Sequence, residues 1–106
     1  MAGAEIRASI AVVPTWVGIE NKLTWAQLEE MYQSGWELMG HSYTHANHTA
    51  LSASQIEYEM EMTTNAIIDN TSVDIVHGYI FPGNAYNALA LRLGWERFDY
   101  LGAPGY

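Results

Sequence analysis

Runs of apolar, β-branched residues recur along the chain. Residues 6–13 (IRASIAVV) form the first run, and Pro14 ends it. A short apolar run stopped by proline is typical of a buried strand. Three further runs of similar character predict strands over residues 36–39, 74–81 and 95–101. Trp36 and Trp95 lie within these strand patterns, so we expect both side chains to be buried.

Two segments carry a complete helix-start signal. Thr24 and Gln27 have the spacing of a capping box, in which the N-cap and N3 side chains each accept a hydrogen bond from the other residue's backbone. Ser52 and Gln55 repeat this spacing later in the chain. The two boxes predict helices that end near residues 34 and 70.

A third helix is predicted over residues 85–93, with Asn84 as its N-cap. Gly94 would follow this helix in the left-handed conformation, as Gly35 would follow the first helix, because glycine adopts that conformation without a steric penalty.

The second helix has one apolar stripe and one acidic run. Ile56, Met60, Thr63 or Thr64, and Ile67 recur at helical spacing and are expected to face the core. The acidic residues are spaced by two, so a helix distributes them around its surface, where we expect them to be solvated. They are Glu57, Glu59 and Glu61.

The predicted order of elements alternates strands and helices, which favours an α/β fold with a parallel sheet and helical crossovers. No linker or low-complexity stretch divides residues 1–106, so the sequence predicts a single domain. About half of the residues (49%) are apolar, which is enough to build a core.

The charge balance restricts the possible partners. Twelve acidic residues against four basic ones give a net charge of -8, and the basic residues are scattered. Nucleic acid and anionic membrane surfaces both require clustered basic residues, so neither is an expected partner.

With no cysteine there is no disulfide and no thiolate metal site. No apolar run approaches the roughly 20 residues of a membrane span, and no signal peptide is recognisable, so the localisation stays undetermined.

Residues 40–49 (GHSYTHANHT) carry the most informative chemistry. They follow a predicted strand and precede a capped helix, which places them at the strand ends where α/β folds bind ligands. His41 and His45 can converge on one divalent metal ion, although the spacing alone is more typical of ordinary polar loop residues. Ser42 excludes the metalloprotease helix motif, which requires glutamate there. His77 lies within a strand pattern, which is more typical of a core or interface histidine.

Two segments resemble motifs of the polysaccharide deacetylases, the chitin, chitooligosaccharide and peptidoglycan deacetylases of carbohydrate esterase family 4. Residues 40–45 (GHSYTH), followed by the helix start at Leu51 and Ser52, resemble the second motif of that family. Residues 78–84 (GYIFPGN) resemble the third motif. The similarity extends over nearly the whole chain.

This resemblance implies a partial (β/α) barrel, about half of the family's domain. It also implies a divalent metal, zinc in most members, with His41 and His45 as ligands, and an N-acetylated glycan as the substrate. Phe81, Pro82 and Gly83 would line one edge of the substrate groove. Trp16 lies in a loop that follows a strand, and we expect it to face the substrate.

The chain also departs from the family pattern. The family's first motif supplies an aspartate pair on the strand before Ile6, but only residues 1–5 precede it, and Glu5 lies in no matching motif. Residues 79–81 replace the usual arginine of the third motif. The catalytic residues therefore stay unassigned, and we expect the chain to be inactive alone. His48 lies close enough to complete a metal site, but the family usually has an apolar residue there.

Two functions remain open at this point. The first is a truncated metal-dependent deacetylase domain that needs other polypeptide for its aspartates. The second is a non-catalytic carbohydrate-binding or assembly module with a degenerate deacetylase fold. Half of a barrel leaves two open sheet edges, which predicts a homo-oligomer formed through those edges.

Overall fold

The computed structural model describes residues 8–20 and 22–102. Residues 6 and 7 of the first predicted strand lie outside this part of the chain. The strands are β1 (Ala8–Val12), β2 (Trp36–Gly40), β3 (Gly78–Ile80) and β4 (Tyr100–Gly102). The α-helices are α1 (Trp25–Gln33), α2 (Ala53–Asn70) and α3 (Ala88–Trp95). Short 3₁₀ turns cover Pro14–Trp16, His48–Ala50 and Pro82–Asn84.

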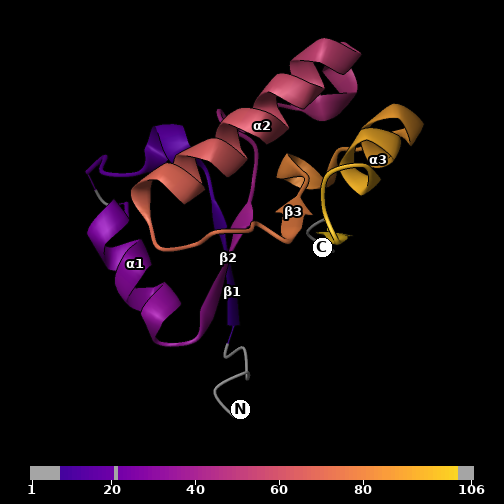
Figure 1. Cartoon of the computed structure of the whole chain (residues 1–106). Helices are drawn as coiled ribbons and strands as arrows, with labels where there is room; N and C mark the ends of the chain where they lie inside the picture. Colours follow the sequence, from indigo (N-terminus) through magenta and orange to yellow (C-terminus); the bar gives the residue numbers. More distant parts are fainter. Residues whose placement is uncertain (1–7, 21, 103–106) are drawn as a thin grey trace.

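The four strands form one parallel sheet in the order β1-β2-β3-β4, and a helix lies in each connection. The predicted α/β fold with helical crossovers is therefore confirmed. Helix α2 runs across β1 and β2, with α1 to one side and α3 to the other (Figure 1). Because the carboxyl ends of parallel strands meet at the same edge of the sheet, the segments that follow β1, β2 and β3 lie near one another.

Both predicted helix starts are confirmed. Thr24 and Ser52 are N-caps, and each has the reciprocal hydrogen bonds of a complete capping box. The first helix ends at Gln33, and Gly35 follows with a φ of 104°, as predicted. The second helix ends at Asn70, which also agrees with the prediction. These signals are local, so they do not depend on how the rest of the chain packs.

The core lies between the helices and the sheet. Helix α2 contributes its predicted stripe, and each of these side chains is less than 2% exposed. Tyr79 from β3 is fully buried in the same core. Burying a large apolar side chain stabilises the fold by about 1.5–3 kcal/mol. The buried stripe of α2 consists of Ile56, Met60, Thr63 and Ile67.

The third helix starts later than predicted. Its N-cap is Asn87, whose side chain accepts a hydrogen bond from the Ala90 amide at 2.9 Å, and not Asn84. Asn84 instead belongs to the 3₁₀ turn after β3, where Gly83 has a φ of 65°. The predicted N-cap of the third helix therefore lies in this turn, and the helix begins at Ala88. Both asparagines are good N-cap residues, so residue type alone could not distinguish them.

The end of the third helix also differs from the prediction. Gly94 lies inside α3 and does not terminate it. A Cβ atom at Gly94 would lie 2.8 Å from Leu101 Cδ1, so glycine allows β4 to pack closely against the helix. Trp95 was expected in a buried strand, but it belongs to α3 and is 57% exposed. Trp36 lies in β2 as predicted, but it is only half-buried.

The third strand is shorter than the predicted 74–81 and covers only Gly78–Ile80. His77 precedes the strand, and its side chain is exposed rather than part of the core. Its Nδ1 is hydrogen-bonded to the carboxylate of Asp99, which lies just before β4. In the part of the predicted strand that precedes β3, Val76 is buried in the core outside any strand, whereas Ile75 is exposed.

Candidate functional site

The histidine-rich loop, residues 41–47, connects β2 to the 3₁₀ turn before α2. Two backbone hydrogen bonds tie it to the end of β1. The His41 amide donates to the Val12 carbonyl at 3.1 Å, and the Thr15 amide donates to the Tyr43 carbonyl at 3.3 Å. The loop therefore sits at the carboxyl end of the sheet, as predicted.

His41 is half-buried and has a fixed ring orientation. Its Nδ1 lies 2.9 Å from the Ile80 carbonyl oxygen. Because a carbonyl only accepts hydrogen bonds, Nδ1 carries the proton and Nε2 keeps a free lone pair. Burial lowers the pKa of His41 below its ordinary value of 6.5, although the bond to Ile80 raises it in part. The ring is therefore neutral at pH 7, which is the form that binds metals.

His45 faces His41 across the loop. The two ring centroids are 4.8 Å apart with an interplanar angle of 72°. The other side of His45 stacks on Trp16, with centroids 4.7 Å apart. The fold thus brings together three residues that the sequence analysis singled out.

The backbone of this loop adopts unusual conformations. Ser42 has a φ of 69° and His45 has a φ of 63°. For residues other than glycine, the left-handed region costs on the order of 1–3 kcal/mol and persists only where neighbouring contacts hold it. The loop is therefore held in place by contacts from outside its own backbone.

Those contacts come largely from Glu59 on α2. Its carboxylate accepts hydrogen bonds from the amides of Tyr43 and Thr44, both at 2.9 Å, and from the hydroxyls of Ser42 and Thr44. Burial would raise the pKa of Glu59, but these hydrogen bonds outweigh burial and lower the pKa below 4.5.

The prediction that Glu59 is solvated is wrong, because the side chain is only 7% exposed. The sequence does contain the signal for its burial. Glu59 stands three residues after Ile56 and four before Thr63, so it belongs to the buried stripe of the helix. A buried carboxylate at such a position requires hydrogen-bond donors from another element. Of the other two acidic residues, Glu57 is half-buried and Glu61 is exposed.

His48 is fully buried and both of its ring nitrogens have partners. Its Nδ1 lies 2.9 Å from the Ala46 carbonyl oxygen, and its Nε2 lies 2.7 Å from the Tyr79 hydroxyl. The Tyr79 hydroxyl consequently donates to Nε2, which leaves no free lone pair on His48. Burial lowers the pKa of His48 and raises the pKa of Tyr79. His48 therefore acts as a buried structural residue.

The donor set at the loop suits a divalent metal only in part. His41 and His45 offer two imidazole nitrogens of the kind that binds zinc, but zinc sites usually have three or four protein ligands. Within residues 8–20 and 22–102, no three side chains of histidine, cysteine, aspartate or glutamate are grouped to hold a metal ion. Among the described residues, the loop thus brings two histidines together without a third side chain of this kind.

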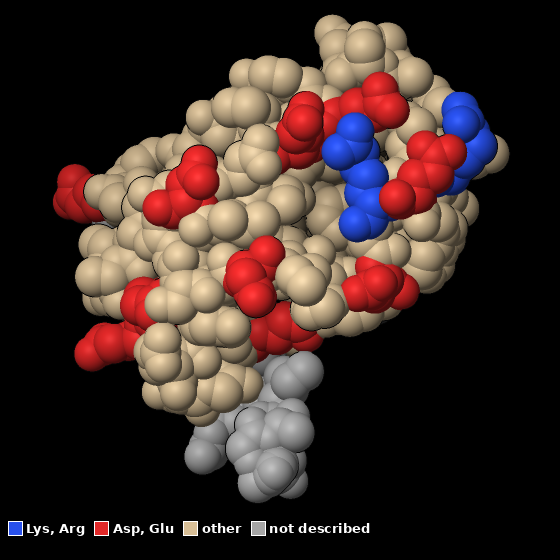
Figure 2. Space-filling model, in the orientation of Figure 1, with Lys and Arg blue, Asp and Glu red and all other residues tan. Residues whose placement is uncertain are grey.

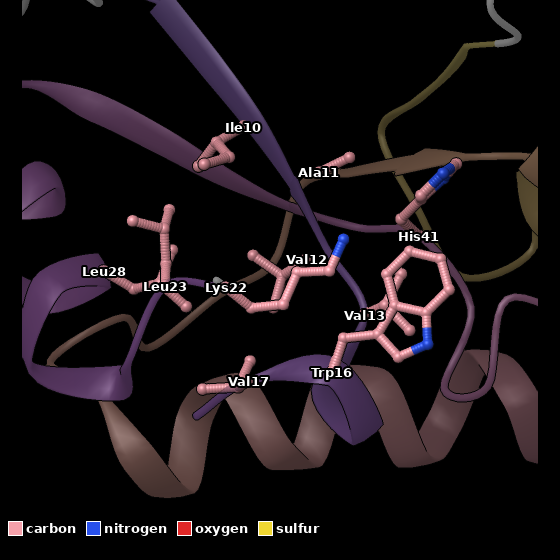
Figure 3. A pocket seen from close by; sticks show the side chains of 10 residues that line it. All are labelled: Ile10, Ala11, Val12, Val13, Trp16, Val17, Lys22, Leu23, Leu28 and His41. Atoms are coloured by element: carbon pink, nitrogen blue, oxygen red, sulfur yellow. The ribbon is translucent and has the colours of Figure 1, made fainter. Parts of the chain in front are cut away.

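A cavity of about 280 Å³ opens beside His41 at the end of β1. Trp16 and His41 lie on one side of it, and Leu23 and Leu28 lie on the other (Figure 3). The ammonium group of Lys22 lies 4.9 Å from the centre of the Trp16 ring system. The cavity is therefore mostly apolar, with one cation and one imidazole in its wall.

The three residues expected to line a groove edge follow β3 directly. Phe81 and Pro82 are buried, and Gly83 is exposed. Phe81 packs edge-on against His48, with ring centroids 5.7 Å apart. Trp16 is 38% exposed, so part of its ring remains accessible to a ligand.

The chain carries twelve acidic residues against four basic ones. Figure 2 shows Asp and Glu distributed over the visible face, with the Lys and Arg side chains of that face gathered at one end. Among the described residues, the helices are too short or too polar to cross a membrane.

A comparison with protein families matches residues 1–96 to the model described as "Polysaccharide deacetylase". None of the curated proteins matches the chain.

Several solved structures share this fold. The deacetylase PplD of Streptococcus pyogenes, in complex with acetate, superposes with a TM-score of 0.81 at 20% identity and covers 92% of this chain and 43% of its own. A CE4 family pseudoenzyme of Bacillus anthracis gives 0.77 at 20% identity, covering 92% and 33%. The Xyl-CE4 domain of a multidomain xylanase from the hindgut metagenome of Trinervitermes trinervoides gives 0.73 at 28% identity, covering 99% and 46%. The chain therefore spans a third to a half of these relatives.

Proposed function

The chain belongs to the polysaccharide deacetylase family, and from this premise we propose that it provides the metal-binding histidines of a metal-dependent deacetylase acting on N-acetylated polysaccharide. The observation that carries the proposal is the facing pair of His41 and His45 at the carboxyl end of the sheet, whose ring centroids are 4.8 Å apart.

The local chemistry supports both histidines as ligands. The Ile80 carbonyl fixes the proton of His41 on Nδ1, which leaves the Nε2 lone pair free as a metal donor. Trp16 restricts the ring of His45 by stacking on it. A divalent metal held by this pair, zinc in our proposal, would supply Lewis-acid polarisation of the amide carbonyl.

The remaining residues of the site have binding roles. The exposed part of Trp16 offers an apolar face on which a sugar ring can stack. The segment after β3 is the proposed edge of the substrate groove, and it consists of Phe81, Pro82 and Gly83. Of these three residues, Gly83 is exposed. We propose that the third metal ligand and the general base come from polypeptide other than residues 8–20 and 22–102.

The metal part of the proposal is tested by zinc titration in a calorimeter. We expect the native chain to bind zinc, and His41→Ala and His45→Ala each to weaken binding at least tenfold. His77→Ala is the matched control, because His77 is exposed and pairs with Asp99 away from the loop. Equal zinc binding by the native chain and the two loop variants would refute the proposal.

The catalytic part is tested by acetate release from an N-acetylated chitooligosaccharide. The assay uses the chain alone with zinc, and the chain mixed with polypeptide that carries the aspartate motif. We expect release only in the mixture. If the mixture releases no acetate, the deacetylase role of the chain is wrong.

A second candidate is a non-catalytic carbohydrate-binding or assembly module. It is favoured by the two-ligand donor set of the described residues. A related fold is also described as a pseudoenzyme. This function predicts that the chain binds the chitooligosaccharide but releases no acetate under any condition. Quenching of tryptophan fluorescence measures the binding.

We also propose that the chain associates with itself. Among the described residues, β1 and β4 are the outer strands of the parallel sheet. Outer strands present unpaired backbone N–H and C=O groups, which favour pairing with another strand.

A further inference from the structure

We infer that Glu59 is the positioning residue of the histidine pair, holding the loop of residues 41–47 in the one conformation that turns His41 and His45 toward each other. This inference rests on the proposed metal-binding function, since it assigns a role toward the same two histidines. Glu59 itself is not offered as a ligand, because its carboxylate is already occupied by donors from the loop.

The Glu59 carboxylate accepts several hydrogen bonds from the loop. Oε1 of Glu59 accepts from the Ser42 hydroxyl, from the amides of Tyr43 and Thr44 at 2.9 Å each, and from the Thr44 hydroxyl at 3.0 Å. The Thr44 hydroxyl also lies 3.1 Å from Oε2. All of these donors belong to three consecutive residues between the two histidines. Hydrogen bonds to a charged acceptor are about twice as strong as neutral ones.

The hydroxyl of Ser42 closes the loop. It donates to Glu59 and at the same time accepts from the Ala46 amide at 3.2 Å. Ser42 directly follows His41, and Ala46 directly follows His45. One hydroxyl therefore bridges the two ends of the segment that carries both rings, and Glu59 fixes the position of that hydroxyl.

These contacts offset strain in the loop backbone. The positive φ angles of Ser42 and His45 are unfavourable for both residue types. Without the carboxylate, the amides of Tyr43 and Thr44 would lose their acceptor and the loop would relax to ordinary backbone angles. The rings of His41 and His45 would then separate, because their facing geometry depends on those angles.

The role is specific to Glu59 among the acids of α2. Glu61 lies two residues further along the same helix, is exposed, and stands outside the buried stripe that carries Glu59. Glu61→Ala therefore removes the same charge and the same side chain from the same helix, which makes it the matched control.

The experiment measures zinc affinity by calorimetry for the native chain, Glu59→Ala, Glu59→Gln and Glu61→Ala. Glu59→Ala should lose roughly 10–100-fold in affinity, the usual range for residues that orient metal ligands. Glu59→Gln should recover most of the loss, because its amide oxygen can accept the bonds that Oε1 accepts. Glu61→Ala should bind as the native chain does.

Amide hydrogen exchange provides a readout that does not involve metal. Exchange at Tyr43, Thr44 and Ala46 should accelerate in Glu59→Ala, while amides in the middle of α1 keep their protection. A uniform loss of protection in α1 and the loop alike would show a general stabilising role and overturn the inference. If Glu59→Ala does not fold, Glu59→Asp replaces it, since it keeps the charge but draws the carboxylate back from the loop amides by one methylene.

The possible failures are distinguishable. If His41→Ala binds zinc as the native chain does, the proposed metal site is wrong. If His41→Ala loses zinc while folded Glu59→Ala, or Glu59→Asp in its place, binds as the native chain does, the metal site stands and the positioning role of Glu59 is overturned.

Discussion

Single residues at this site act through their protonation state as much as through their position. The carboxylate of Glu59 is stable in the interior only because four donors surround it, and the proton on His41 is directed to Nδ1 by one carbonyl. The hydrogen bonds keep Glu59 charged where burial alone would oppose the charge, and the Ile80 carbonyl determines which nitrogen of His41 keeps its lone pair. The chemistry of the loop is therefore sensitive to pH and to single-atom changes.

The acid stability of the protein should depend on Glu59. Burial raises its pKa, but hydrogen bonds from Ser42, Thr44 and Tyr43 lower it further, so the folded pKa lies below the unfolded one. A depressed folded pKa contributes stability that is present above the unfolded pKa and is lost as pH falls through the folded value. Urea unfolding below pH 4.5 should therefore show a smaller loss of unfolding free energy in Glu59→Gln than in the native chain. Parallel losses in both proteins would contradict this.

The hydrogen bond between Tyr79 and His48 should contribute to stability. In Tyr79→Phe, Nε2 of the buried His48 loses the donor that it has among the described residues, while Nδ1 keeps its bond to Ala46. An unsatisfied buried polar group costs about 1–3 kcal/mol, and we expect that loss in the free energy of unfolding at pH 7. Tyr58→Phe is the control, because Tyr58 is exposed. Equal stability of Tyr79→Phe and the native chain would show that water replaces the hydroxyl.

At the scale of elements, predictions succeeded where the signal is local. Each capping box, at Thr24 and at Ser52, joins the N-cap to the residue three positions later and so determines where the helix begins. The sequence was therefore sufficient there. The start of α3 was not predictable in this way, since Asn84 and Asn87 compete and the 3₁₀ turn decides between them. The stripe position of Glu59 in α2 indicates its burial, but its hydrogen-bond donors lie in a loop that precedes it by 15 residues or more, and the pattern within α2 does not identify them.

The contact between β2 and α2 should be intolerant of a larger residue at Gly40. A Cβ atom there would lie 2.8 Å from Tyr79 Cδ1 and 3.1 Å from Thr63 Cγ2. The Tyr79 ring cannot move away easily, because its hydroxyl is bonded to His48. We expect Gly40→Ala to lower the free energy of unfolding by about 1–3 kcal/mol, as overpacking does in other cores.

Gly102→Ala is the matched control for this contact. Its new Cβ would meet only Ile80 Cγ1, at an ordinary 3.6 Å. Chemical unfolding of both variants measures the difference. If the two glycine variants lose the same stability, close packing at Gly40 is not the reason that β2 carries glycine there.

At the scale of the whole molecule, the described residues form one parallel sheet with β1 and β4 as its outer strands. The chain corresponds to between 33% and 46% of the related structures compared above. In a closed barrel the outer strands of such a segment pair with further strands, so their backbone groups are satisfied. The proposed self-association follows from the same requirement, with a second copy providing the additional strand.

The net charge makes this self-association dependent on salt. Two chains that each carry a charge of -8 repel one another, and the repulsion is screened over about 10 Å at 0.1 M ionic strength. Hydrogen bonds between strands, in contrast, are nearly independent of salt. Sedimentation equilibrium should therefore give a mass closer to twice the 11.8 kDa of one chain as ionic strength rises. A mass of one chain at every salt concentration would contradict strand pairing between copies, and a dimer that dissociates as salt is added would point to ion pairs as its cause.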